Sequence, residues 1–159
     1  MSAALVPDAE VAGLLAGFRD AAAHHEAGHV VLADLYHEPV EEVAVWYVRT
    51  RRWVGPDEWS VTGRTLTSPA DPAVGLLVAV AGVEAEALRT GRPARRLRAA
   101  NPGDLRLVAD YGRRTDLSED DARHEARALL HDHWGAVEAV ADALSHTGRL
   151  TGRDLARIL

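Results

Sequence analysis

Cysteine is absent from the 159-residue sequence. Its absence excludes disulfide bonds, thiolate ligands for a metal and a cysteine nucleophile, and it leaves the redox compartment undetermined. Any protein ligand to a metal ion must therefore be a histidine, an aspartate or a glutamate. The chain has 8 histidines and 24 acidic residues to draw on.

Lysine is absent as well, because all 18 basic residues are arginine. A P-loop needs a lysine for the phosphates, a kinase needs one on its third strand, and Schiff-base enzymes need one as a nucleophile. These classes are excluded. We expect no ATP binding through a Walker motif of this chain.

Aromatic residues make up only 5% of the sequence, and long apolar runs are missing. The longest uncharged apolar run, residues 73–83, covers roughly half a membrane span. The start, MSAALVPDAEVAG, lacks the basic leader and apolar core of a secretory signal. We therefore expect a soluble, cytoplasmic protein without membrane insertion, with residues 1–159 forming one domain.

An excess of positive charge is also lacking, since the net charge is −6 and the pI about 5.7. Such a chain has no general attraction for polyanions, so we expect no nucleic-acid partner. The arginine-rich stretch RTGRPARRLR (89–98) has no interleaved aromatic residues. We interpret it as a solvated loop that is available to dock an acidic partner or another subunit.

What is present favours helices, because alanine and leucine dominate the 47% of hydrophobic residues. Apolar periodicity and proline and glycine positions predict a mainly α protein with a small β hairpin or sheet. The expected helices are residues 8–37, 70–90, 102–115, 118–147 (one helix or a helical hairpin) and 151–159, and the β region is 40–67. Trp46, Tyr47, Trp53 and Trp59 fall in the β region, where core packing is the favoured interpretation and a substrate groove the alternative.

The stretch AAAHHEAGHVVLADL (21–35) carries a candidate metal site. On a helix, residues four apart differ by about 40° in direction and about 6 Å in rise, so His25 and His29 project side by side. Glu26 lies at the edge of the same face. This is an HExxH motif, in which two imidazoles bind zinc and the glutamate acts as general base on a zinc-bound water. His24 has Gly28 four residues on, so it is a bystander or a supporting group.

A catalytic zinc needs a third protein ligand, and no further motif histidine follows His29. Glu84, Glu86 and Asp104 are candidates that periodicity alone does not separate. For Glu84 or Glu86 taken alone, pairing with an arginine is the favoured interpretation. The alternative for the whole motif is a polar network between helices without a metal.

Five segments in unbroken order, over roughly residues 20–159, resemble the peptidase domain of FtsH, a membrane-anchored zinc metalloprotease with an AAA ATPase module. HHEAGHVVLADL resembles its motif helix, and VEEVAVWYV with SVTGRT resembles its following strands. LLVAVAGVEAEALRTG, NPGDLRLVADYGRR and the C-terminal LLHDHWGAVEAVADALSHTGRLTGRDLARIL are similar to later segments. The resemblance implies a zincin-like helical peptidase fold.

The resemblance also implies roles for residues. His25, His29 and Asp104 would bind one Zn²⁺ per chain, Glu26 would be the general base, and Glu86 would support the ligands. The membrane helices and the ATPase module of the family are missing here. We therefore expect an ATP-independent zinc metalloendopeptidase acting on peptides or unfolded or partner protein segments. The alternative is a zinc-binding regulatory or interaction module, and the sequence leaves open whether the chain forms a homo-oligomer or binds a partner protein.

Overall fold

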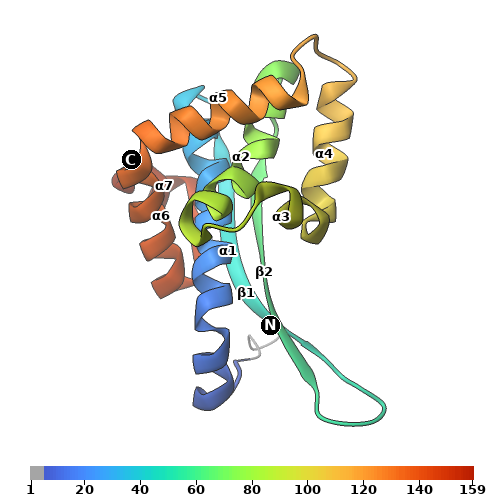
Figure 1. The fold of residues 1–159 in the computed structure, drawn as a ribbon. Helices are drawn as coiled ribbons and strands as arrows, with labels where there is room; N and C mark the ends of the chain where they lie inside the picture. Colours follow the sequence, from blue (N-terminus) through green and yellow to red (C-terminus); the bar gives the residue numbers. More distant parts are fainter. Residues whose placement is uncertain (1–5) are drawn as a thin grey trace.

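A computed structural model describes residues 6–159 and shows a mainly helical protein with one small antiparallel sheet (Figure 1). Residues 1–5, at the start of the sequence where we expect no secretory signal, lie outside the residues that the structure describes. The elements in chain order are α1 (Ala9–Leu35), β1 (Val40–Thr50), β2 (Glu58–Thr67), α2 (Pro72–Thr90), α3 (Ala94–Ala100), α4 (Pro102–Gly112), α5 (Glu119–Asp132), α6 (Trp134–Thr147), β3 (Arg149–Thr151) and α7 (Gly152–Ile158).

Helix α1 runs through the middle of the molecule and carries the HExxH motif. Asp8 caps its start by accepting a hydrogen bond from the Val11 amide at 2.9 Å. The second half, residues 23–33, is fully buried, whereas the first half projects beyond the body, with Leu14 75% and Phe18 63% exposed. The helical spacing of the first half therefore does not reflect packing against the core.

The sheet has the strand order β2-β1-β3, with both pairings antiparallel. β1 and β2 form the predicted hairpin, in which Val45 lies opposite Gly63. The short strand β3 was not predicted, because three residues are too few for a period-two pattern. β2 is an edge strand of this sheet within the described chain, so its outer side is free to pair with an extended peptide.

Helix α2 packs against the motif half of α1. Asp71 caps its start, Pro72 occupies the first turn, and Gly91 ends it with a positive φ of 70°. A Cβ at Gly28 of α1 would lie 2.7 Å from the Ala81 carbonyl oxygen, so glycine is required for this close crossing. The packing of the two helices offsets the cost of a glycine inside a helix. No helix of residues 6–159 has both the length and the apolar character needed to cross a bilayer.

The arginine-rich stretch 89–98 is not wholly a loop, which corrects the prediction. Residues from Ala94 onward form helix α3, because Leu97 is buried and holds the segment on the body. Asn101 ends α3 and its side-chain amide donates to the Leu97 carbonyl at 2.9 Å. The next helix, α4, begins immediately at Pro102 and ends at Gly112, three residues before the predicted end.

The C-terminal region has two consecutive helices, α5 packed on α2 and α6 packed on α1, followed by β3 and the short helix α7. Ser118 caps α5 by accepting a hydrogen bond from the Asp121 amide at 3.1 Å. The predicted span 118–147 breaks at His133, which separates α5 from α6. Gly148, with a φ of 74°, then turns the chain into β3. The mainly α prediction with a small sheet is confirmed.

Candidate metal centre

Two histidines of α1 and one carboxylate of α4 converge at one point. The Nε2 atom of His25 lies 2.8 Å and that of His29 3.6 Å from Oδ2 of Asp104. One ligand atom from each of the three residues fits within 4.8 Å of the others. Two atoms bound to the same tetrahedral zinc at about 2.0–2.1 Å lie roughly 3.3 Å apart, so the spacing suits a shared ion.

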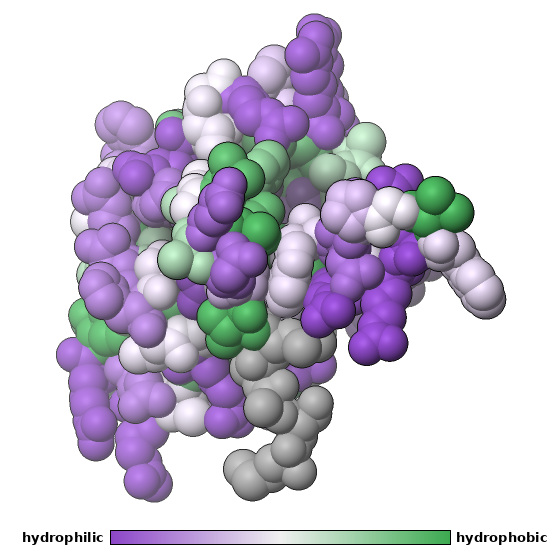
Figure 2. All heavy atoms as spheres, turned by 90° about the horizontal axis from the view of Figure 1, so that it is seen from below, coloured by the Kyte–Doolittle hydropathy of each residue, from purple (hydrophilic) through white to green (hydrophobic). Residues whose placement is uncertain are grey.

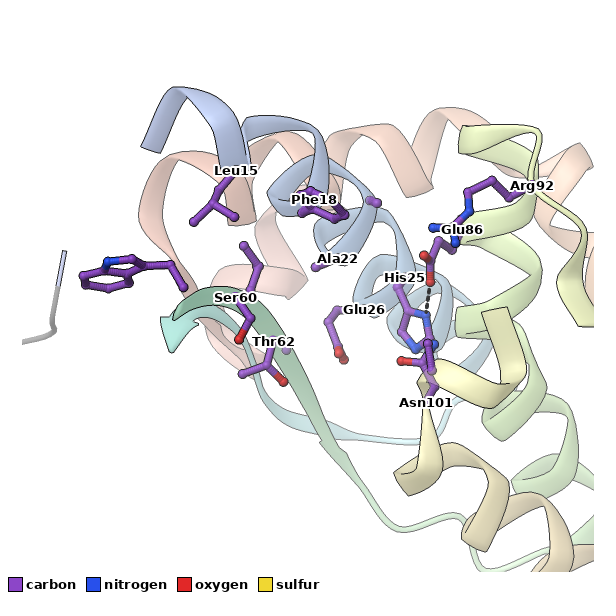
Figure 3. A pocket seen from close by; sticks show the side chains of 15 residues that line it. Leu15, Phe18, Ala22, His25, Glu26, Ser60, Thr62, Glu86, Arg92 and Asn101 are labelled. Atoms are coloured by element: carbon purple, nitrogen blue, oxygen red, sulfur yellow. Dashed lines mark hydrogen bonds and ion pairs between the residues drawn. The ribbon is translucent and has the colours of Figure 1, made fainter. Parts of the chain in front are cut away.

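The other ring nitrogen of each histidine has its own partner. Nδ1 of His29 donates to the backbone carbonyl of Val78 at 2.7 Å, and Nδ1 of His25 donates to Oε2 of Glu86 at 3.0 Å (Figure 3). In the absence of a metal, Nε2 of His25 donates to Oδ2 of Asp104 at 2.8 Å, whereas a bound metal would take the place of that proton. Such Nδ1 partners orient ligand histidines and raise their basicity.

The charges around this point favour a cation. Burial by itself lowers the pKa of His25, but the carboxylates of Asp104 and Glu86 outweigh it and raise this pKa to about 10. Burial also lowers the pKa of His29, but the charge and hydrogen bond of Asp104 together with the charge of Glu26 outweigh it, so this pKa is raised. Burial raises the pKa of Asp104, yet the two histidines hold it well below its usual range. Positive charge is therefore stabilised where the three side chains meet.

Gly82 of α2 leaves space at the same point. A Cβ at this position would collide with the Nε2 atoms of both His25 and His29. The two imidazoles therefore lie so close to the α2 backbone that residue 82 must lack a side chain. Two imidazole nitrogens and one carboxylate oxygen match the protein donor set of a catalytic zinc site, which has three protein ligands.

Glu26 lies beside these residues and faces strand β2. Its Oε2 accepts a hydrogen bond from the Thr65 hydroxyl at 2.7 Å, and a Cβ at Gly63 would lie 2.5 Å from its Oε1. The side chain is 6% exposed, so it is nearly enclosed between α1 and β2. The strand thus fixes one carboxylate oxygen and leaves room for the other.

A pocket of about 450 Å³ opens over Glu26 and His25. In Figure 3 the side chains of Ser60, Thr62 and Leu15 lie on one side of it, and Glu86, Arg92 and Asn101 on the other. The volume lies within the range of small-ligand sites. The pocket runs along β2 and has His25 and Glu26 in its wall, whereas His29 and Asp104 are not among its lining residues.

The aromatic residues of the β region do not form a core, contrary to the favoured interpretation. Trp53 is fully exposed near the tip of the hairpin and Trp46 is 40% exposed. Trp59 is half-buried and lines the pocket. Tyr47 lies under the guanidinium of Arg19 at 5.0 Å. Alternation alone identified the strands but not the strand face that the core covers.

The remaining candidates lie elsewhere. Glu84 pairs with Arg123 at 2.9 Å and with Arg127 at 3.3 Å, which is the favoured arginine pairing, while Glu86 bonds to His25 instead. His24 bonds through Nδ1 to the Asp20 carbonyl at 2.9 Å and stacks on the Trp134 ring at 5.7 Å. It is not one of the converging side chains.

Four parts of the site did not emerge from the sequence. They are the Thr65 hydroxyl, the Val78 carbonyl, Gly63 and Gly82. A backbone carbonyl carries no residue-type signal, and a strand threonine is ordinary. Gly82 did carry a signal, because a glycine inside an apolar helix indicates close approach of another group.

The site was then compared with known proteins. A scan against family models finds no match, and a search of curated proteins finds none at a significant level. The FtsH-type resemblance therefore stays a prediction based on the motifs.

Proposed function

We propose that this protein is an ATP-independent zinc metalloendopeptidase of the FtsH-like zincin type. The observation that carries the proposal is the convergence of His25, His29 and Asp104 from two helices, with Glu26 beside them in an open pocket. The donor set leaves a coordination position for substrate or water. Bound zinc would polarise a peptide carbonyl and make a water more acidic.

The residues of the chain divide the remaining work. Oε2 of Glu26 is held by the Thr65 hydroxyl, so Oε1 is the atom available to take a proton from the attacking water. As the water oxygen bonds to the carbonyl carbon and the C–N bond breaks, the same carboxyl group delivers that proton to the leaving nitrogen. Gly63 permits the carboxylate to lie this close to the strand.

Strand β2 supplies a way to hold the substrate. An extended peptide that pairs with the free β2 edge would run past Glu26 and His25, and its side chains would alternate toward and away from the pocket. Backbone pairing does not depend on side-chain identity, which suits an endopeptidase acting on unfolded segments. Independence from ATP is supported by the complete absence of lysine.

The test compares zinc content and hydrolysis of unfolded casein in three variants. We expect Glu26→Gln to keep its zinc and to lose turnover by about 100-fold or more, because the proton acceptor is removed. His29→Ala should lose both zinc and turnover. Glu41→Gln, which removes an exposed carboxylate of β1, is the control and should retain both.

Two results would contradict the peptidase. One is hydrolysis that persists in Glu26→Gln or after complete removal of the metal with EDTA. The other is full zinc occupancy with no cleavage of any member of a broad peptide library, which would favour a zinc-binding regulatory or interaction module instead.

A further inference from the structure

Arg92 lies at the edge of the pocket, directly after helix α2. The left-handed turn at Gly91 ends the helix, and the Arg92 amide donates to the Thr90 hydroxyl at 3.3 Å. Figure 3 shows the Arg92 side chain beside Glu86, across the pocket from Leu15. The turn thus brings one guanidinium to the wall that also holds His25.

This guanidinium has no ion-pair partner among residues 6–159. The neighbouring arginines differ, since Arg89 pairs with Asp20 at 2.8 Å and Arg98 pairs with Glu119. The nearest acid on the pocket wall, Glu86, already accepts the hydrogen bond of His25. The Arg92 guanidinium lines the pocket, and its N–H groups therefore remain available to donate hydrogen bonds to a bound molecule.

We infer that Arg92 binds a carboxylate of the peptide substrate, so that the enzyme selects peptides with an acidic group on the α2 side of the cleaved bond. This inference rests on the proposed function. A guanidinium offers paired donors that match a carboxylate, and its charge contrasts with the net charge of −6 of the chain. The opposite wall has Leu15, Phe18 and Trp59 together with the hydroxyl-bearing Ser60 and Thr62, and none of these side chains is charged, so the two walls differ in charge.

A nucleic acid fits this pocket less well than an acidic peptide. Phe18 and Trp59 line the pocket, but the segment 89–98 that carries the guanidinium has no aromatic residue on which a base could stack. The pocket lining also includes the carboxylates of Glu26 and Glu86, which would repel a continuous phosphate backbone. A single carboxylate placed at Arg92 lies near Glu86 only, whereas a phosphate polymer would pass both carboxylates.

The experiment measures binding of labelled short peptides to the full-length, zinc-loaded Glu26→Gln variant by fluorescence anisotropy. One peptide carries an internal glutamate and blocked ends, a second has glutamine in its place, and a third has glutamine with a free C-terminal carboxylate. We expect the glutamate peptide to bind about five- to tenfold more tightly than the blocked glutamine peptide at low salt. Tighter binding of the third peptide alone would assign the carboxylate to the C-terminus.

Arg92→Gln in the same background should remove the difference between the peptides and keep the zinc. Arg52→Gln is the matched control, because this arginine is exposed, lies outside the pocket and has no ion-pair partner in the described chain. Equal affinities for all three peptides, or a preference that survives Arg92→Gln, would overturn the inference. Tighter binding of single-stranded RNA than of either carboxylate peptide would also overturn it. If the proposed peptidase function is wrong, the wild type will cleave none of the peptides, and that result is independent of the binding measurements.

Discussion

At the scale of single residues, small features of the neighbouring elements position the motif. Glu26 is flanked by a hydroxyl at Thr65 and by the missing side chain of Gly63, and the two imidazoles face the missing side chain of Gly82. The sequence identified His25, Glu26 and His29 by their spacing alone. It could not identify Thr65, because the contact joins residues 39 positions apart.

The hydroxyl of Thr65 should matter for turnover and not for zinc. Thr65→Val removes the bond to Oε2 of Glu26, and a hydrogen bond to a charged group contributes about 1.5–3 kcal/mol, so we expect a loss of roughly tenfold to a hundredfold in kcat. Thr65→Ser should restore most of it. Thr67→Val, which removes a hydroxyl bonded to the Pro39 carbonyl, should leave kcat unchanged. Steady-state kinetics with metal analysis would check this, and equal losses in both valine variants would contradict it.

At the scale of elements, the site depends on how α1, α2 and α4 are held together. Gly28 sets the close crossing of α1 and α2, and the pair between His25 and Asp104 joins α1 to α4. Two ion pairs also join α2 to α5, because buried Glu84 pairs with Arg123 and with the half-exposed Arg127. The packing of α2 therefore determines where Gly82 and Glu86 lie.

The ion pairs of Glu84 between α2 and α5 lead to a prediction about stability. Arg123→Met leaves Glu84, which is 4% exposed, without its nearer partner, and we expect a loss of about 3 kcal/mol in the free energy of unfolding. Arg127→Met should cost less than about 1 kcal/mol, because water screens a half-exposed pair. Urea unfolding of the zinc-loaded proteins measures both. Equal losses would show that Arg123 has no special role.

Most elements could be predicted from local patterns, and the exceptions have physical reasons. The motif helix, the hairpin and α2 have clear periodicity or end signals in Asp8, Pro72 and Gly91. Helix α3 was missed because a single buried residue, Leu97, holds it, and β3 because it pairs with a strand over 100 residues earlier. Asp104 was one candidate among several until the resemblance singled it out. The fold then brought it to His25.

At the scale of the whole molecule, two projections flank the pocket. The first half of α1 and the tip of the hairpin both extend beyond the packed helices (Figure 1). Seen from this end, exposed apolar side chains stand out on a largely hydrophilic face (Figure 2), in keeping with the exposure of Leu14, Phe18 and Val54. In the proposed peptidase, an unfolded segment would meet this apolar surface before it reached the motif.

If the proposed zinc is bound, its removal should lower the stability of the entire domain, because ligands from α1 and α4 would share the ion. Zinc at 100 times its Kd contributes about 2.7 kcal/mol, which for a chain of this size raises Tm by roughly 5–10 °C. Thermal unfolding with zinc and with EDTA measures the difference. In Asp104→Asn the difference should largely disappear, and a shift as large as that of the wild type would remove Asp104 from the ligand set.

The division of α1 into a buried and an exposed half also has a dynamic consequence. Backbone amides in the exposed half are protected only by the helix itself, so they open and exchange with solvent through local fraying. Those of residues 23–33 open only when the packed core opens. Leu15 and Phe18, on the exposed half of α1, can therefore change position on a fast timescale, while His25, Glu26 and His29 keep their mutual geometry; in the proposed peptidase this would let the wall adjust to differently shaped substrates.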